Sequence, residues 1–221
     1  MEAAALRSGR DPSGVALLAA VKQRSAAEIR ELAGEGVRLL GENRVQEGES
    51  HLAELGAEFR SEVTVRFIGR LQANKARRAL KAFDAVDSVD GLELARRLSR
   101  IAEEEGVTRE VLLEVNLGLE EQKGGVEPSH AGELARAVSA LPGLILAGLQ
   151  GVPPLAEDPA ASRPYFREMA RLFEEIRRGH PRPELFRHLS MGMSHDFEVA
   201  VEEGATMVRI GTALFGPRRS S

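Results

Sequence analysis

Two short segments near the end of the chain place small hydroxyl residues and glycine directly after apolar runs. The first is Leu189–Ser194, and about a dozen residues later a second apolar run ends in Ile210, Gly211 and Thr212. Where a strand ends and a helix begins, unpaired backbone N–H groups and the helix dipole both favour an anion. The spacing of one strand and one helix predicts that the two segments lie side by side. We therefore predict a phosphate-binding site at these two strand ends.

Lys22 is the second candidate for chemistry, because it ends the first apolar run, Leu17–Lys22, in a chain with few lysines. An ammonium group at the apolar mouth of a barrel is partly desolvated, which favours the uncharged, nucleophilic amine. Such lysines form Schiff bases with carbonyl compounds. The alternative is a strand-end lysine whose ammonium reaches back to water. A neighbouring phosphate site favours the Schiff-base interpretation.

Arg209 lies within the last apolar run, Met207–Ile210. A guanidinium stays protonated at physiological pH, so it acts as a fixed donor wherever its strand points to a ligand. The alternative is an interior arginine that is ion-paired with a carboxylate. Asn43, at the end of the second run, either contacts a ligand at the same mouth or caps the next helix. The polar residues that open the third predicted helix are interpreted as solvated capping residues: Gln72, Asn74 and Lys75.

The remaining titratable residues are interpreted as surface or packing residues. None of the 5 histidines has the spacing of a metal ligand, so we expect no metal site. His195 is the one histidine next to a predicted site segment. The glutamates of the helical stretches, Glu47 and Glu49 among them, are expected on solvated faces.

Strand-length apolar runs alternate with helical patterns along the whole chain, which predicts a parallel sheet covered by helices. Eight such runs favour a closed (β/α)8 TIM barrel over an open doubly wound sheet, and barrels often bind phosphate after strands seven and eight. Too few residues follow Ile210 for a full eighth helix, and a short helix over Met1–Ser8 is expected to cover the gap. The expected strands are Val15–Val21, Val37–Leu40, Val63–Ile68, Ala85–Val89, Val111–Asn116, Leu144–Leu149, Leu185–Ser190 and Thr206–Ile210. The expected helices between them are Ala26–Gly34, Val45–Phe59, Ala73–Phe83, Leu92–Glu105, Pro128–Ala140, Pro164–Arg178 and Asp196–Glu203.

Composition narrows the class of protein. The 221 residues, 43% of them hydrophobic, fit one domain spanning 1–221 with a substantial core. The absence of cysteine excludes disulfides and fits a reducing cytoplasm. A net charge of −4 and a single tyrosine argue against a nucleic-acid partner. No apolar run has the length of a signal peptide or a membrane span, so we expect a soluble, cytoplasmic protein with no membrane partner.

Seven segments, in order and covering nearly the whole chain, closely resemble the pyridoxal-phosphate homeostasis proteins, single-domain relatives of the alanine racemase barrel. The resemblance implies a type III pyridoxal-phosphate fold with pyridoxal 5'-phosphate held as a Schiff base on Lys22. By motif position, Ser194, Gly211 and Thr212 are expected to hold the phosphate, Arg209 to face the pyridine nitrogen and Asn43 to lie near the ring. The segments are Val21–Lys22, Gly41–Glu47, Phe67–Lys75, Ser88–Asp90, Lys123–Gly125, Ser190–Ser194 and Val208–Gly216.

The chain departs from the usual pattern of this family at three places in these strand ends. Arg44 stands where a tyrosine is common, and Arg66 where a histidine usually precedes Phe-Ile-Gly. Gln150 and Gly151 replace the usual Met-Ala or Met-Thr. All three lie around the expected ring position rather than at Lys22 or the phosphate segments.

We expect a non-catalytic carrier or regulator that buffers or delivers pyridoxal phosphate, with pyridoxal-phosphate-dependent apo-enzymes as partners and a monomeric state. The first alternative is an amino-acid racemase, which needs a base on each face of the substrate α-carbon. Racemases take the second base, a tyrosine, from a second domain, and Tyr165 is the only tyrosine here. A Schiff-base aldolase acting on a phosphosugar is the other alternative.

Overall fold

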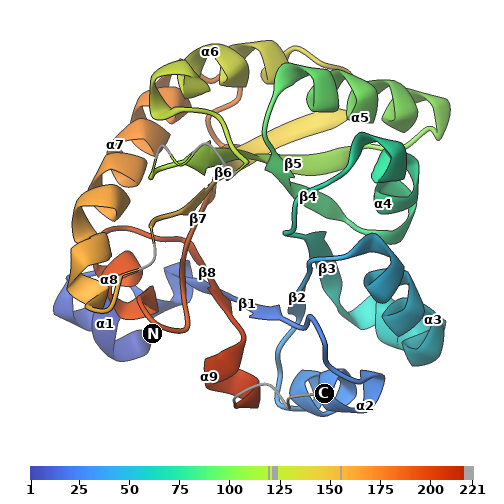
Figure 1. Cartoon of the computed structure of the whole chain (residues 1–221), viewed down its shortest axis with the longest axis horizontal. Helices are drawn as coiled ribbons and strands as arrows, with labels where there is room; N and C mark the ends of the chain where they lie inside the picture. The colour runs from blue at the N-terminus through green and yellow to red at the C-terminus, as the bar shows by residue number, and fades with distance from the viewer. Residues whose placement is uncertain (119, 121–123, 155, 217–221) are drawn as a thin grey trace.

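The computed structural model describes residues 1–118, 120, 124–154 and 156–216. Within these residues, eight parallel strands form a closed barrel in which each strand pairs with the next along the chain. The barrel closes where β8 pairs with β1, with Leu18 opposite Arg209 (Figure 1). This closure confirms the predicted (β/α)8 fold, and the open-sheet alternative is wrong. The strands are β1 (Ala16–Ala20), β2 (Leu39–Glu42), β3 (Thr64–Phe67), β4 (Ala85–Val89), β5 (Arg109–Asn116), β6 (Leu144–Val152), β7 (His188–Met193) and β8 (Met207–Ile210).

A helix follows each strand and covers the outside of the barrel (Figure 1). The longer ones are amphipathic: α5 buries Leu94, Leu98 and Ile101 on one face, at the spacing of helical turns. Among the described residues none of the helices is both long and apolar enough to cross a membrane. The helices are α1 (Glu2–Arg7), α2 (Ala26–Gly34), α3 (Val45–Glu62), α4 (Ala76–Ala82), α5 (Leu92–Glu104), α6 (Pro128–Ser139), α7 (Arg163–Gly179), α8 (Phe197–Glu202) and α9 (Thr212–Phe215), with short 3-10 turns η1 (Pro12–Gly14), η2 (Ala73–Lys75) and η3 (Pro159–Ser162).

The predicted N-terminal helix is present as α1 and packs against α8. Ala4 and Ala5 are buried in the core, and Arg7 donates hydrogen bonds to Glu198 and Glu202 of α8. The last helix, α9, is only four residues long. As expected, the helix after the eighth strand is short, and the N-terminal helix α1 covers the barrel beside α8.

Two predicted elements differ from the structure in a way that matters for the site. Strand β7 spans His188–Met193 rather than Leu185–Ser190, so Ser194 directly follows the strand. The apolar signal before it comes from Phe186, which is fully buried and stacks on Phe173 of α7 outside the strand. The helix predicted over Ala73–Phe83 is divided into η2 and α4.

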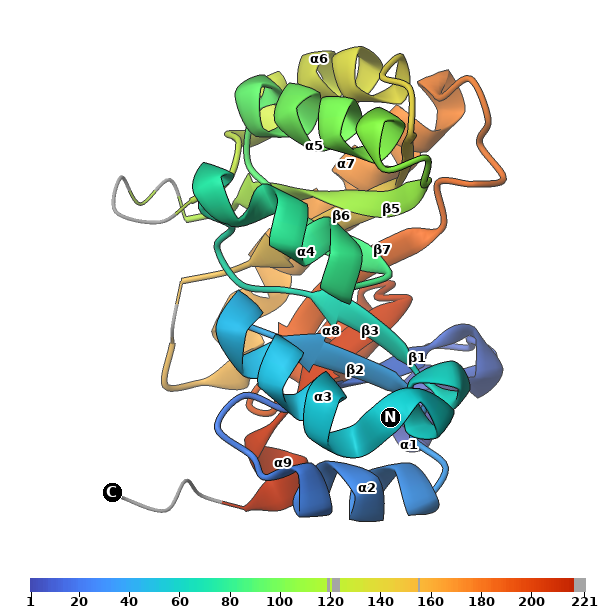
Figure 2. The same cartoon turned by 90° about the vertical axis from the view of Figure 1, so that its right-hand side faces the viewer.

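The carboxyl ends of β5 and β6 lie on the same side of the barrel (Figure 2). Ligand sites of (β/α)8 barrels lie on this side. Lys123, which belongs to one of the segments of the family resemblance, lies outside the described residues. The interior toward the other end holds a buried ion network, in which Arg66 donates hydrogen bonds to Asp87 and Glu110.

Candidate cofactor site

A cavity of about 310 Å³ lies at the carboxyl ends of the strands, and all six residues predicted for the cofactor site line it. They come from the ends of β1, β2, β7 and β8, which closure of the barrel brings together. Their proposed roles stay predictions. The lining consists of Ala20, Lys22, Arg24, Asn43, Ile68, Glu114, Gln150, Val152, Met193, Ser194, His195, Arg209, Gly211 and Thr212.

The two segments predicted to bind phosphate meet at Ser194. The backbone N–H groups of Gly211 and Ala213, which follow β8, both donate to the Ser194 hydroxyl oxygen at 3.2 Å. Asp196 stabilises the loop that carries Ser194, because its carboxylate accepts a hydrogen bond from the Met193 N–H at 2.7 Å. The Ser194 oxygen thus accepts from both N–H groups, and its own O–H remains as a donor at the cavity wall.

Lys22 lies two residues after β1, half-buried at the cavity wall. The chain turns sharply behind it, because Gln23 adopts a left-handed backbone with φ of 58°, which is uncommon for a residue other than glycine. The Gln23 N–H donates to the Glu47 carboxylate of α3, and this contact fixes the turn. Glu47 was expected on a solvated helix face; it is partly exposed there, and its carboxylate in addition supports the backbone next to Lys22, a contact that the sequence did not predict.

Arg209 is buried inside the barrel and held by three hydrogen bonds. It donates to the Ser190 carbonyl and hydroxyl oxygens, both at 2.8 Å, and to the Gly151 carbonyl at 2.9 Å. No carboxylate among the described residues forms an ion pair with it, so the ion-pair alternative is wrong. Burial lowers the pKa of the Arg209 guanidinium, an effect that the charges of Asp87 and Glu114 oppose. Arg209 is therefore a fixed, charged donor at the cavity wall.

Asn43 does not cap the helix that follows it. The residue at the cap position of α3 is Arg44, and no side chain caps this helix. The Oδ1 atom of Asn43 is buried without a hydrogen-bond partner, and so is Oε1 of Gln150 on the same cavity wall. Buried polar atoms without partners are rare in folded proteins, and both of these belong to residues that line the cavity.

Sequence reasoning missed several lining residues. Glu114 is an acidic residue inside the apolar strand β5, the same signal that identified Arg209 in β8. Burial raises the pKa of the Glu114 carboxyl, and the positive charge of Arg209 opposes that shift. Arg24 donates to the Gly216 carbonyl at 3.1 Å and lies over the Phe215 ring, so it ties the loop after β1 to α9. The two residues of this contact are 192 positions apart, so no local sequence pattern could predict it.

His195 is exposed and lines the mouth of the cavity. The single tyrosine, Tyr165, lies in α7 and lines a different cavity, between α6 and α7. Among the described residues no group of three or more histidine, aspartate or glutamate side chains has the arrangement of a metal site.

Comparison with known proteins agrees with this geometry. The profile of the family described as "Alanine racemase, N-terminal domain" matches residues 3–219. The pyridoxal phosphate homeostasis protein of Aquifex aeolicus is 42% identical, over 96% of this chain and 91% of its own length. The chain belongs to the pyridoxal phosphate homeostasis protein family. This membership confirms the resemblance that the sequence segments indicated.

Two solved structures show how this barrel compares with those of other proteins. PipY of Synechococcus elongatus, solved with pyridoxal phosphate bound, superposes with a TM-score of 0.82 at 38% identity, covering 97% of this chain and 98% of PipY. Alanine racemase of Corynebacterium glutamicum superposes with a TM-score of 0.71 at 18% identity, covering 97% of this chain but 59% of the racemase. The second likeness shows the shared barrel fold alone.

Proposed function

We propose that this homeostasis protein binds pyridoxal 5'-phosphate in the 310 Å³ cavity and buffers or delivers it, with Lys22 covalently attached to the aldehyde carbon. The observation that carries the proposal is that all six residues predicted from the sequence surround this one space. A second support is the family itself, since PipY has been solved with pyridoxal phosphate bound.

The residues present fit the cofactor. The cavity volume falls in the range of about 300–1,000 Å³ that is usual for small-molecule sites. The amine of Lys22 and the hydroxyl groups of Ser194 and Thr212 belong to residues that line the same space, which suits the cofactor's aldehyde and phosphate. Asn43 and Gln150, each with one unpartnered amide oxygen, line it as well. Gly211 lines the cavity, and a Cβ added there would make only an ordinary contact with Ala20, at 3.5–3.6 Å.

Each residue then has one role. The Lys22 amine attaches the cofactor, while Ser194, Gly211 and Thr212 hold its phosphate. Arg209 faces the pyridine nitrogen as a fixed donor and keeps that nitrogen unprotonated. When bound, pyridoxal phosphate supplies an electron sink, and an unprotonated ring is a weak one.

We propose a carrier rather than a racemase. A racemase needs a second base opposite the lysine. In racemases that base is a tyrosine, whereas Tyr165 lines another cavity, between α6 and α7. We further propose that residues 1–221 act as one cofactor-binding domain, as a cytoplasmic monomer that supplies apo-enzymes.

The attachment site is tested by reduction with borohydride. Purified protein is expected to be yellow, and reduction is expected to fix the cofactor on the peptide that contains Lys22. Lys22→Ala removes the attachment, whereas Lys81→Ala, an exposed lysine paired with Glu105, serves as the matched control. Reducible, covalently attached cofactor in Lys22→Ala would overturn the assignment.

Activity is tested by incubation with L-alanine. The D-enantiomer is expected to form no faster than with free pyridoxal phosphate and a control protein. Turnover on the order of 1 per second, an ordinary enzymatic rate, would favour the racemase instead.

A further inference from the structure

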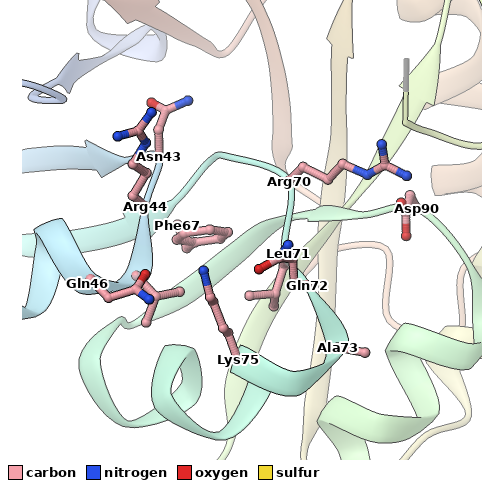
Figure 3. A pocket seen from close by; sticks show the side chains of 11 residues that line it. Asn43, Arg44, Gln46, Phe67, Arg70, Leu71, Gln72, Ala73, Lys75 and Asp90 are labelled. Carbon is pink, nitrogen blue, oxygen red and sulfur yellow. The ribbon is translucent and has the colours of Figure 1, made fainter. Parts of the chain in front are cut away.

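A second cavity, of about 620 Å³, lies beside the cofactor cavity, and Asn43 lines both. It is formed after β2 and β3 and at the start of α4 (Figure 3). Nothing in the proposed carrier function uses it. The lining consists of Asn43, Arg44, Val45, Gln46, Phe67, Arg70, Leu71, Gln72, Ala73, Lys75 and Asp90.

The lining of the second cavity is cationic in a protein of net negative charge. Arg44, Arg70 and Lys75 contribute three positive charges and Asp90 one negative charge, which leaves two positive charges in excess. Figure 3 shows Lys75 extending up between Gln46 and Gln72, with Arg44 on one side and Arg70 on the other, near Asp90. Three cations from two connections, β2–α3 and β3–α4, therefore line one cavity: Lys75 points into it, and the exposed Arg44 and Arg70 flank it with their guanidinium groups directed to opposite sides.

These cations are not used to stabilise the fold. Within the part of the chain that the structure describes, neither Arg44 nor Lys75 forms an ion pair, whereas Arg77 and Arg78 of the same region bind glutamates. The sequence suggested solvated capping for Gln72, Asn74 and Lys75. Gln72 and Lys75 do occupy the N-cap positions of η2 and α4, but no side chain caps either element, so the capping bond itself was wrongly predicted. Lys75 is also half-buried, so its ammonium is partly withdrawn from water.

The other walls suit the organic part of a ligand. Phe67 and Leu71 are buried apolar residues that border the cavity. The side-chain amides of Gln46 and Gln72 supply neutral donors and acceptors from two sides (Figure 3). Arg44, where the family commonly has tyrosine, adds a positive charge to this wall.

We propose that the second cavity binds a phosphate monoester of a small organic molecule, with the phosphate among Arg44, Arg70 and Lys75 and the apolar part against Phe67 and Leu71. A phosphate monoester carries about −1.5 to −2 charges at pH 7, which matches the excess positive charge of the lining. Hydrogen bonds from cations to phosphate oxygens are strong because both partners are charged. The site is independent of the attachment of pyridoxal phosphate to Lys22.

Isothermal titration of phenyl phosphate tests the site, at constant ionic strength, into protein whose cofactor cavity is loaded with pyridoxal phosphate. One binding event is expected, with phenol not binding and benzoate binding at least several-fold more weakly. Lys75→Ala is expected to weaken binding about tenfold, the loss of one hydrogen bond to a charged group. Arg44→Tyr introduces, at an exposed position, the residue common in the family and is expected to weaken binding several-fold.

Two control variants separate this site from its neighbours. Arg97→Ala changes an adjacent cationic surface pocket and is expected to leave phenyl phosphate binding unchanged. Ser194→Ala changes the cofactor cavity, and in protein loaded with pyridoxal phosphate it is also expected to leave phenyl phosphate binding unchanged. Absence of binding, equal binding of benzoate, or binding that depends on Ser194 or Arg97 rather than on Lys75 and Arg44 would overturn the proposal.

The same variants keep this result separate from the proposed carrier function. If the protein does not load pyridoxal phosphate, that function fails. Titration of the unloaded protein then still distinguishes a Lys75-dependent site from a Ser194-dependent one.

Discussion

Arg66 and Arg209 are both buried in the interior of the barrel, but their charges are balanced in different ways. Arg66 is 3% exposed and donates to Asp87 at 2.7 Å and to Glu110 at 3.1 Å. Arg209 is 6% exposed and donates only to carbonyl and hydroxyl oxygens. Burial acts to lower the pKa of both guanidinium groups. For Arg66 the two carboxylates outweigh burial, and its pKa is raised; for Arg209 burial prevails, and its pKa is lowered.

The difference separates a structural part of the barrel from a ligand-binding part. Around Arg66 the donors and acceptors satisfy one another, and Glu110 also accepts from Arg187. Around Arg209 the buried oxygens of Asn43 and Gln150 have no partner. Perturbed groups and unsatisfied atoms cluster at functional sites, whereas a paired buried charge mainly requires that its partner stay in place.

The largest expected effect comes from removing the partner of Arg66. Asp87→Ala leaves a buried guanidinium with only Glu110 beside it, and removal of one member of a buried ion pair costs about 3–5 kcal/mol. Urea unfolding measures the free energy of unfolding. The matched control is Glu49→Ala, which removes the partner of exposed Arg78 and is expected to cost at most about 1 kcal/mol. Equal losses in the two variants would show that the Arg66 network is not structural.

On the ligand side, the expected effect is on cofactor retention instead of stability. Ser194→Ala removes a hydroxyl from the phosphate loops, and a hydrogen bond to a charged group contributes about 1.5–3 kcal/mol. Pyridoxal phosphate is therefore expected to bind roughly ten- to a hundredfold more weakly, as measured by equilibrium dialysis.

Gly211→Val is expected to weaken cofactor binding further without unfolding the barrel. The added Cβ meets Ala20 at an ordinary contact distance of 3.5–3.6 Å, so the barrel accommodates it, and the valine methyl groups are expected to occupy cavity space that the phosphate needs. Pyridoxal, which lacks the phosphate, serves as the ligand control and is expected to bind the native protein poorly. Equal affinity for pyridoxal and pyridoxal phosphate would show that these loops are not a phosphate site.

Sequence reasoning predicted the surroundings of Arg209, where the ligand is expected, better than the ion network of Arg66. Lys22, Ser194 and Arg209 carry local signals, since each is a polar residue at the end of an apolar strand or within one, and barrel closure brings such positions together. Arg66 stood out only as a departure from a family pattern. Its partners lie 21 and 44 positions further along the chain, and no local spacing connects them.

The errors share a physical cause. Lys75 and Asn43 precede helices, where capping is the common role of polar residues. Neither side chain caps a helix: the Lys75 ammonium has no acceptor for a helix N–H, and Asn43 lies one residue before the cap position of α3. Both side chains line cavities instead, because the carboxyl ends of the strands meet there. Local propensity cannot distinguish these uses, since the deciding neighbours come from other strands.

The Arg66 network also predicts a dependence of stability on pH. His188, whose Nε2 lies 3.6 Å from the carboxylate, and Arg66, which donates a hydrogen bond to it, lower the pKa of the Glu110 carboxyl to about 2, from an ordinary value of 4.5. Because this pKa is depressed, its stabilising contribution is present above about pH 4.5 and is lost as the pH falls toward 2. The difference in urea midpoint between native protein and Glu110→Gln is expected to shrink between pH 5 and about pH 2.5. A difference that stays constant over this range would assign the effect of the substitution to packing rather than to charge.

The smallest expected effect is on the hydrogen bonds of Arg209. Ser190→Ala removes one acceptor, but the same guanidinium nitrogen keeps the Ser190 carbonyl at 2.8 Å, so the charge does not lose its position. A net loss of about 0.5–1.5 kcal/mol in the free energy of unfolding is expected, the usual contribution of one hydrogen bond. Cofactor retention is expected to change by less than in Ser194→Ala, because Arg209 still reaches the cavity. A stability loss as large as that of Asp87→Ala would mean that Arg209 depends on one neighbour as Arg66 does, and the contrast between the two arginines would not hold.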